Sequence, residues 1–209
     1  MEGPPTELPW ARAAYEHLLG ADPAMAALAR RRGLLARTLT RDYFAHLVRA
    51  IVAQQISGQA AASIYRRLAE RAGDPPIPQA LAALADDEIR GCGVSGAKLL
   101  ALRDLAARAL DGRLDLPHLD TLPDEEIVAQ LVAVRGIGRW TAQMFLMFAL
   151  GRPDVLPAED LGIQNAVKHL FRLEEHPKPA TVRLLAETGR WHPYATAACF
   201  YLWESLSER

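Results

Sequence analysis

Apolar residues recur along most of the chain at the three- and four-residue spacing of amphipathic helices. The clearest example is one helical face formed by Tyr43, Phe44, Leu47, Val48 and Ile51. The same spacing predicts further helices over residues 10–20, 57–71, 78–85, 95–110, 123–133, 140–150, 160–171, 181–189 and 195–205. Because no stretch alternates apolar and polar residues as a half-buried strand does, the pattern predicts an all-α protein.

Two glycines, Gly136 and Gly138, separate the helix predicted at 123–133 from the one at 140–150. Pro123 suits a first helical position, and three acidic residues follow it, where carboxylates stabilise the positive end of a helix dipole. Glycine allows positive φ and leaves backbone N–H groups bare, so such a turn can hold one phosphate. A two-glycine turn alone is weak evidence, because most such turns only join helices. Residues 86–95 repeat this order and predict a second, weaker hairpin.

Composition narrows the class of protein. The 209 residues, half of them apolar, can bury a substantial core as one large domain or as two halves. No apolar run approaches the ~18 residues of a membrane span, and no secretion signal opens the chain. We therefore expect a soluble, cytoplasmic monomer, associated with the nucleoid if it is bacterial.

Charge and cysteine content exclude two kinds of protein. A net charge of −1 argues against a protein that coats nucleic acid, but it allows an enzyme that touches a few phosphates. The two cysteines, Cys92 and Cys199, are too few for a four-cysteine iron–sulfur cluster or zinc site. The six histidines show no metal-ligand spacing. We expect no required cofactor.

Three segments together resemble the helix-hairpin-helix DNA glycosylase superfamily, and within it the alkylpurine (3-methyladenine) DNA glycosylases. They are AIVAQQIS (residues 50–57), VRGIGRWTAQMFL (134–146) and DVLPAEDLGI (154–163). The match is specific because the hairpin and the acidic turn occur together, and it extends from Tyr43 to Trp203. One departure is Arg135, which stands where many relatives have proline.

This resemblance implies a helical fold with no N-terminal β domain and with a DNA-binding cleft between two halves. On that basis the chain is one glycosylase domain, residues 1–209. Subdomain a spans about 1–50 plus 165–209, and subdomain b spans about 51–164 with the hairpin at 123–150.

The resemblance assigns catalysis to Asp160, although the residue alone is better explained as an ordinary helix N-cap. Free N–H groups at a helix N-terminus keep such a carboxylate ionised. Beside a deoxyribose, it would stabilise the positive charge that develops as the base leaves, and it would orient water. Glu159 is the nearest competitor for this role.

In strand-cleaving relatives a Schiff-base lysine occupies the position of Trp140. Its replacement implies a monofunctional enzyme that leaves an abasic site. An aromatic ring over a cationic alkylated purine gains stacking and cation–π attraction of about 1–2 kcal/mol. The resemblance implies that Tyr194, Met144 and Leu161 complete the base pocket, whereas Trp191 could be a core residue.

The resemblance also implies how DNA is held. Gln54 and Gln55 would meet the minor groove, with Gln55 inserted where a nucleotide has been flipped; a plain capping role for both glutamines stays open. The hairpin residues expected to bind DNA are Gly136, Ile137, Gly138, Arg139 and Thr141. A structural Na⁺ or K⁺ would bind the backbone carbonyls of Val132, Val134 and Ile137. Lys98 is expected to be solvated or paired.

The expected function is therefore hydrolysis of the N-glycosidic bond of 3-methyladenine or 7-methylguanine in double-stranded DNA. Alternatives are a glycosylase for hypoxanthine, uracil or an oxidised purine, and a non-catalytic helix-hairpin-helix DNA-binding module. A helical interaction protein whose glycines only turn the chain is a third. Asp160 and the Gln54-Gln55 segment favour the enzyme, because a binding module needs neither.

Overall fold

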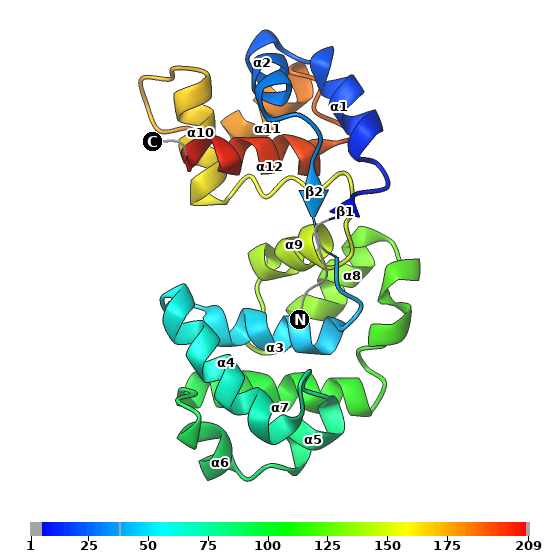
Figure 1. Ribbon diagram of the computed structural model, residues 1–209, viewed down its shortest axis with the longest axis vertical. Helices are drawn as coiled ribbons and strands as arrows, with labels where there is room; N and C mark the ends of the chain where they lie inside the picture. Colours follow the sequence, from blue (N-terminus) through cyan, green and yellow to red (C-terminus); the bar gives the residue numbers. More distant parts are fainter. Residues whose placement is uncertain (1–5, 38, 208–209) are drawn as a thin grey trace. The chain divides into compact units, whose positions relative to one another are not determined.

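The computed structural model describes residues 6–37 and 39–207 (Figure 1). Within them the chain is mostly helical, which confirms the all-α prediction. The helices are α1 (Ala11–Leu19), α2 (Pro23–Arg32), α3 (Tyr43–Ala53), α4 (Gly58–Ala72), α5 (Pro78–Ala83), α6 (Asp86–Gly91), α7 (Gly96–Leu110), the 3-10 helix η1 (Leu116–Thr121), α8 (Asp124–Val132), α9 (Arg139–Phe148), α10 (Leu161–Leu170), α11 (Pro179–Thr188) and α12 (Ala195–Leu206).

Local details differ from the sequence prediction at three places. Strands β1 (Thr6–Glu7) and β2 (Ala36–Arg37) pair antiparallel, and at two residues each they are too short to show alternation. Helix η1 occupies a segment expected to be a loop. Pro123 precedes α8 as its N-cap instead of opening it, so the acidic first turn begins directly at Asp124.

The first of two compact units comprises the described residues up to Leu39 and from Leu146 onward. Its centre is α12, which is buried from Ala195 to Leu202 and packs against α1, α2 and α10. Trp191 lies in this core, where it stacks on Phe171 and donates its indole N–H to Asp22 (3.0 Å). The suggestion that Trp191 is a core residue is thereby confirmed.

The second unit runs from Thr40 to Phe145 and includes the glycine hairpin. Helix α7 packs against α3, α5 and α6, and its leucines Leu99, Leu102 and Leu105 are buried. Serine hydroxyls begin two of these helices, as the sequence predicts. Ser57 Oγ accepts the Ala60 N–H (3.3 Å), and Ser95 Oγ accepts the Lys98 N–H (3.4 Å).

The boundaries of these units differ from the predicted ones at about residues 50 and 164. Helix α3 belongs to the second unit because it packs on α4 and α7. The segment after residue 145 belongs to the first unit because distant side chains hold it there. Trp10 donates to the Gly151 carbonyl (2.6 Å), and the Val155 amide donates to the Thr196 hydroxyl (2.9 Å).

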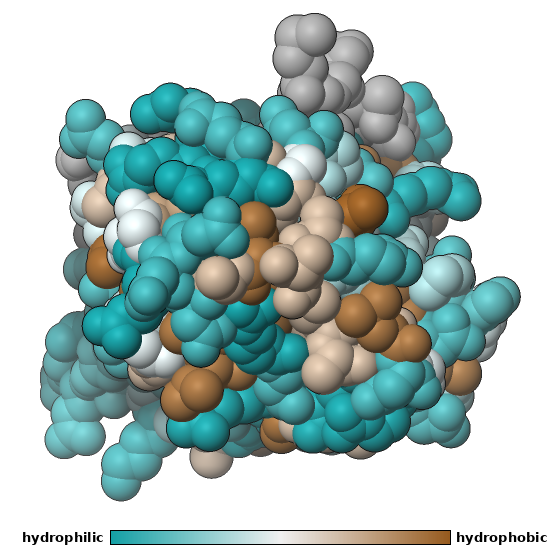
Figure 2. All heavy atoms as spheres, turned by 90° about the horizontal axis from the view of Figure 1, so that it is seen from below, coloured by the Kyte–Doolittle hydropathy of each residue, from teal (hydrophilic) through white to brown (hydrophobic). Residues whose placement is uncertain are grey.

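Polar residues dominate the face shown in Figure 2, where hydrophobic residues form small groups among hydrophilic ones. Ten large hydrophobic side chains are notably exposed among the described residues, and two of them, Trp140 and Leu161, were predicted for the base pocket. In the part of the chain that the structure describes, no helix has the length and apolar character needed to cross a membrane.

Candidate active site

The hairpin between α8 and α9 is a tight turn over residues 134–137. The Ile137 N–H donates to the Val134 carbonyl (3.1 Å), and Gly136 has φ +77°. Positive φ at the third residue only is the geometry of a type II turn, which favours glycine there. A Cβ on Gly136 would also lie 3.3 Å from the Cβ of Ala101 on α7. Gly136 is therefore required by both conformation and packing.

Gly138 differs from the prediction, because its φ is not positive. The chain has already reversed at Gly136, so two residues later the backbone is entering α9. A Cβ built on Gly138 would meet no described atom within 4 Å. Gly138 thus leaves open surface at the N-terminus of α9, where a phosphate can approach backbone amides.

The other hairpin residues differ in what they expose. Ile137 and Thr141 are buried, so contacts from them to DNA would run through the backbone. Arg139 is exposed, and Glu125 of α8 holds its guanidinium at two points, 2.7 and 3.2 Å. Arg139 would therefore have to exchange a carboxylate for a phosphate when it binds DNA.

Residues 54–57, between α3 and α4, lie against this hairpin. The Gln54 amide nitrogen donates to the Gly136 carbonyl (2.9 Å), so two segments 82 residues apart in the chain meet here. Gln55 is exposed and has φ +57°, an uncommon conformation for a residue with a side chain. Such backbone outliers cluster at functional sites.

Lys98 of α7 holds the end of α3, which leads into the same loop. Its Nζ donates to the carbonyl of Val52 (2.7 Å) at the C-terminal end of α3, where helix carbonyls lack intrahelical partners. Partial burial lowers the pKa of Lys98. The expectation that Lys98 is paired is met by a backbone carbonyl.

Helix α9 carries the two base-pocket residues of the second unit. Trp140 is 48% exposed, and Met144, one helical turn later, is half-buried on the same face. Between them Thr141, Ala142 and Gln143 are buried, so the other faces of this helix pack into the core. Trp140 is thus positioned to offer its ring at the surface.

Asp160 belongs to the first unit, where it is the N-cap of α10. Its Oδ1 accepts the Ile163 N–H (2.8 Å) and the indole N–H of Trp203 (3.0 Å). A Cβ on Gly162 would lie 3.0 Å from both Asp160 Oδ1 and Trp203 Nε1. Gly162 therefore leaves the space in which carboxylate and indole meet.

Two other first-unit residues were also predicted for the pocket. Leu161 is 64% exposed directly after Asp160. Tyr194, at the N-terminus of α12, is half-buried and contacts the edge of His17 with ring centroids 5.4 Å apart. The competing carboxylate, Glu159, is exposed and pairs with Arg183 of α11. Among the two acidic residues of this turn, Asp160 alone is held by two N–H donors through one oxygen.

Three residues that shape the site were not predicted from the sequence: Trp203, Gly162 and Asp104. Trp203 follows the apolar run of α12, where an aromatic residue is more often a core residue. Gly162 was visible in the DVLPAEDLGI segment, yet its need for space is set by Trp203, 41 residues later. Asp104 accepts the amide of Arg135 in the hairpin (2.7 Å).

The carbonyls expected to bind a monovalent cation lie at the end of α8 and in the hairpin turn. Val132 ends α8, so its carbonyl is among the last four, which lack helical partners. The Val134 carbonyl accepts the Ile137 N–H and keeps a second lone pair. A set of backbone oxygens suits a hard cation.

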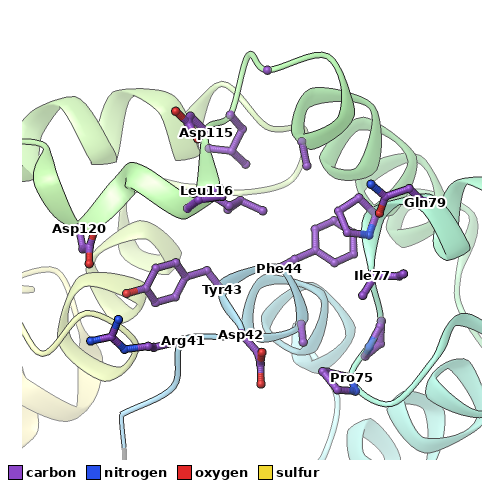
Figure 3. Close-up of a pocket in the computed structure, with 17 residues that line it drawn as sticks. Arg41, Asp42, Tyr43, Phe44, Pro75, Ile77, Gln79, Asp115, Leu116 and Asp120 are labelled. Atoms are coloured by element: carbon purple, nitrogen blue, oxygen red, sulfur yellow. The ribbon is translucent and has the colours of Figure 1, made fainter.

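A pocket of about 570 Å³ lies elsewhere in the second unit (Figure 3). Tyr43, Phe44 and Leu116 lie around its centre. None of the described residues that line it was predicted as a site residue. Asp42, Asp115 and Asp120 outnumber Arg41 on its walls, so its charge does not suit a phosphate.

The geometry defines a class: a helical protein with an open glycine turn between two helices and a carboxylate fixed at a helix N-terminus. Residues 48–190 match the HhH-GPD superfamily of base excision DNA repair proteins, and the chain belongs to this family.

Relatives in this family agree with that assignment. DNA-3-methyladenine glycosylase 1 of Schizosaccharomyces pombe is 34% identical over 169 residues, which cover 79% of this chain and 73% of the relative. The structure of the 3-methyladenine DNA glycosylase of that yeast in complex with abasic DNA is similar, with a TM-score of 0.81 and 31% identity over 93% of this chain and 97% of that one. A Bacillus halodurans DNA-3-methyladenine glycosidase gives a TM-score of 0.87 and 30% identity, covering 99% and 95%.

Proposed function

We propose that this chain is a monofunctional DNA glycosylase of base excision repair, which removes alkylated purines from duplex DNA and leaves an abasic site. The observation that carries the proposal is the Asp160 carboxylate, held through Oδ1 by the Ile163 amide and the Trp203 indole. The relatives support it, because they are named for 3-methyladenine, and one was solved with abasic DNA.

The chemistry requires a carboxylate in a fixed position. As the base departs, the deoxyribose acquires oxocarbenium character, and a nearby negative charge stabilises that state. Two N–H donors prevent Asp160 from rotating away, so little reorganisation is needed during the reaction. The same carboxylate can orient a water molecule for attack on the sugar.

Base recognition in this proposal falls to Trp140. A ring that is 48% exposed can stack on a flipped purine, and a positively charged alkylated purine adds cation–π attraction. Met144 lies on the same face of α9, and the exposed Leu161 and half-buried Tyr194 are the proposed remaining contacts. Flipping itself costs a few kcal/mol, less for a damaged base.

DNA binding in this proposal uses two segments of the second unit. The backbone around Gly136 and Gly138 holds a phosphate, and Gln55 fills the space that the flipped nucleotide leaves. The positive φ and the exposure of Gln55 support this role, since uncommon backbone conformations cluster at functional sites. A Na⁺ or K⁺ held by the carbonyls of Val132, Val134 and Ile137 would supply positive charge for the phosphate. We expect the protein to be found with the DNA, in the cytoplasm or nucleoid.

A base-release assay tests the proposal. Duplexes that contain 3-methyladenine, 7-methylguanine, hypoxanthine or uracil are incubated with the protein, and free bases are separated by chromatography. Release of the two methylated purines, with strands that break only after added alkali, is expected. Release of uracil or hypoxanthine alone would show that the substrate is not an alkylated purine. Trapping of a protein–DNA adduct by borohydride would overturn monofunctional chemistry.

A further inference from the structure

The amide of Arg135, the second residue of the glycine turn, is held by a carboxylate from α7. Its N–H donates to Asp104 Oδ2 at 2.7 Å. The same oxygen accepts the Nε of Arg108, one helical turn further along α7, at 2.9 Å. Because Arg135 is the second residue of the turn, this bond fixes the peptide plane at which the chain leaves α8.

The environment of Asp104 favours its charged form. Its partial burial would by itself raise its pKa, but the Arg135 N–H, with the hydrogen bond and charge of Arg108, outweighs burial, so the pKa lies below its usual value. Hydrogen bonds to an ionised acceptor are about twice as strong as neutral ones. The hydrogen bond from the Arg135 N–H to the ionised Asp104 is thus stronger than a bond to a neutral acceptor.

Helix α7 packs against α3 (Figure 1). It presents three residues to this region at three-residue spacing. Lys98 holds the Val52 carbonyl, Ala101 packs against Gly136, and Asp104 holds the Arg135 amide. From the other segment, Gln54 holds the Gly136 carbonyl. Side chains therefore fix adjacent residues of the turn, one through its N–H and the other through its carbonyl.

We propose that Asp104 is a positioning residue of the hairpin: by holding the Arg135 amide it sets the orientation of the turn, and with it the amides that grip DNA. The inference rests on the proposed function, because the group gripped is a phosphate of the DNA substrate. The competing explanation is that Asp104 serves only the Arg108 ion pair on its own helix, a contact of type i, i+4.

Proline at position 135 separates these explanations. Proline has no backbone N–H, and it suits the second residue of a type II turn, so Arg135→Pro removes the donor without opposing the turn. Asp104→Ala in the natural sequence should weaken binding to a duplex with an abasic-site analogue about tenfold. In the Arg135→Pro background, the same change should weaken binding by less than about twofold, because the N–H it serves no longer exists.

In Asp104→Ala the loss of affinity should exceed any loss in the rate of base release at saturating enzyme, because Asp104 holds the hairpin amide, whereas the proposed catalytic carboxylate is Asp160. A loss mainly of binding is what a positioning role in a phosphate grip predicts. General damage to the fold would lower both quantities, and thermal unfolding of each variant detects it.

Two control variants separate the loss of the hairpin bond from the change in charge and from the loss of the ion pair with Arg108. Asp111→Ala makes the same charge change at the end of α7, where Asp111 holds only Arg113 among the bonds described, and it should leave affinity within about twofold. Arg108→Gln removes the ion pair but keeps the Asp104 bond to Arg135. Asp104→Asn keeps an uncharged acceptor, should show a smaller loss than Asp104→Ala, and replaces it in the cycle if the alanine variant does not fold.

The outcomes are distinguishable. An equal loss from Asp104→Ala in both backgrounds, or no loss in either, would overturn the positioning role and leave the proposed function standing. An unmodified protein that neither binds abasic-site duplex nor releases bases would overturn the proposed function and the inference together.

Discussion

Trp140 is proposed to determine two properties of the reaction, the absence of strand cleavage and the preference for cationic bases. Its ring is 48% exposed at the start of α9. Trp140→Ala should reduce release of cationic 7-methylguanine more than release of neutral hypoxanthine, by about 1–2 kcal/mol in transition-state free energy. The measurement is kcat/KM on duplexes with each base. Equal losses on both would leave Trp140 as a stacking or packing residue.

Tyr201 predicts a dependence of stability on pH. Burial, with Tyr15 and Glu204 nearby, raises the pKa of Tyr201 from 10.0 to about 12, and its hydroxyl donates to the Gly33 carbonyl (2.8 Å). Because the folded pKa is the higher one, this contribution is complete below pH 10 and is lost as the pH rises toward 12.

Tyr201→Phe isolates that contribution. The variant should be less stable at pH 7 by about 1 kcal/mol, since the Gly33 carbonyl loses its donor. Its stability deficit, measured by urea unfolding, should shrink between pH 10 and 12. A deficit that stays constant over this range would show that the phenol does not titrate with folding.

At the scale of elements, the two hairpin glycines have different tasks. Gly136→Ala places a side chain at φ +77° and 3.3 Å from Ala101, so the fold should lose about 1–2 kcal/mol. Gly138→Ala meets no described atom within 4 Å, so stability should hold while a methyl group obstructs the phosphate. Thermal melts and affinity for abasic-site duplex measure the two effects. Unchanged affinity in Gly138→Ala would contradict a phosphate site at this surface.

The loop between α3 and α4 has an equally separable role. Gln55→Ala should reduce affinity for lesion duplex more than for single strands, because a plug matters only where a flipped base leaves a hole. Gln55→Gly is the matched control, because it also removes the side chain that would fill the space left by the flipped base. Glycine adopts φ +57° freely, so this variant should not lower stability. A fall in affinity for Gln55→Ala but not for Gln55→Gly would point to backbone strain instead.

Across the whole chain, the sequence predicted those features that are encoded within a single segment. Apolar spacing placed most of the helices but not α2, and serine caps at Ser57 and Ser95 placed two helix starts. Two-residue strands left no pattern to detect. The unit boundaries depended on contacts such as Trp10 with Gly151, which no local pattern encodes.

The same limit applies to the site. Asp160 and Gly136 were recognisable from their own segments, but Trp203 and Asp104 act through contacts 43 and 31 residues away. The positive φ expected at Gly138 was wrong because Gly136 alone completes the turn. Spacing in the sequence identifies which residues can react, whereas packing determines what holds them.

In the proposed mechanism, Asp160 supplies the negative charge that drives base removal. Asp160→Asn keeps an oxygen for the Ile163 and Trp203 donors, so the helix cap and DNA binding should persist. The most direct measurement is single-turnover release of 7-methylguanine and 3-methyladenine from methylated duplex by the natural protein and by this variant. We expect the rate to fall on the order of 10²-fold or more while affinity for abasic-site duplex is retained. A variant that releases bases at close to the natural rate would overturn the role of Asp160, and Glu159 would then be tested as the carboxylate.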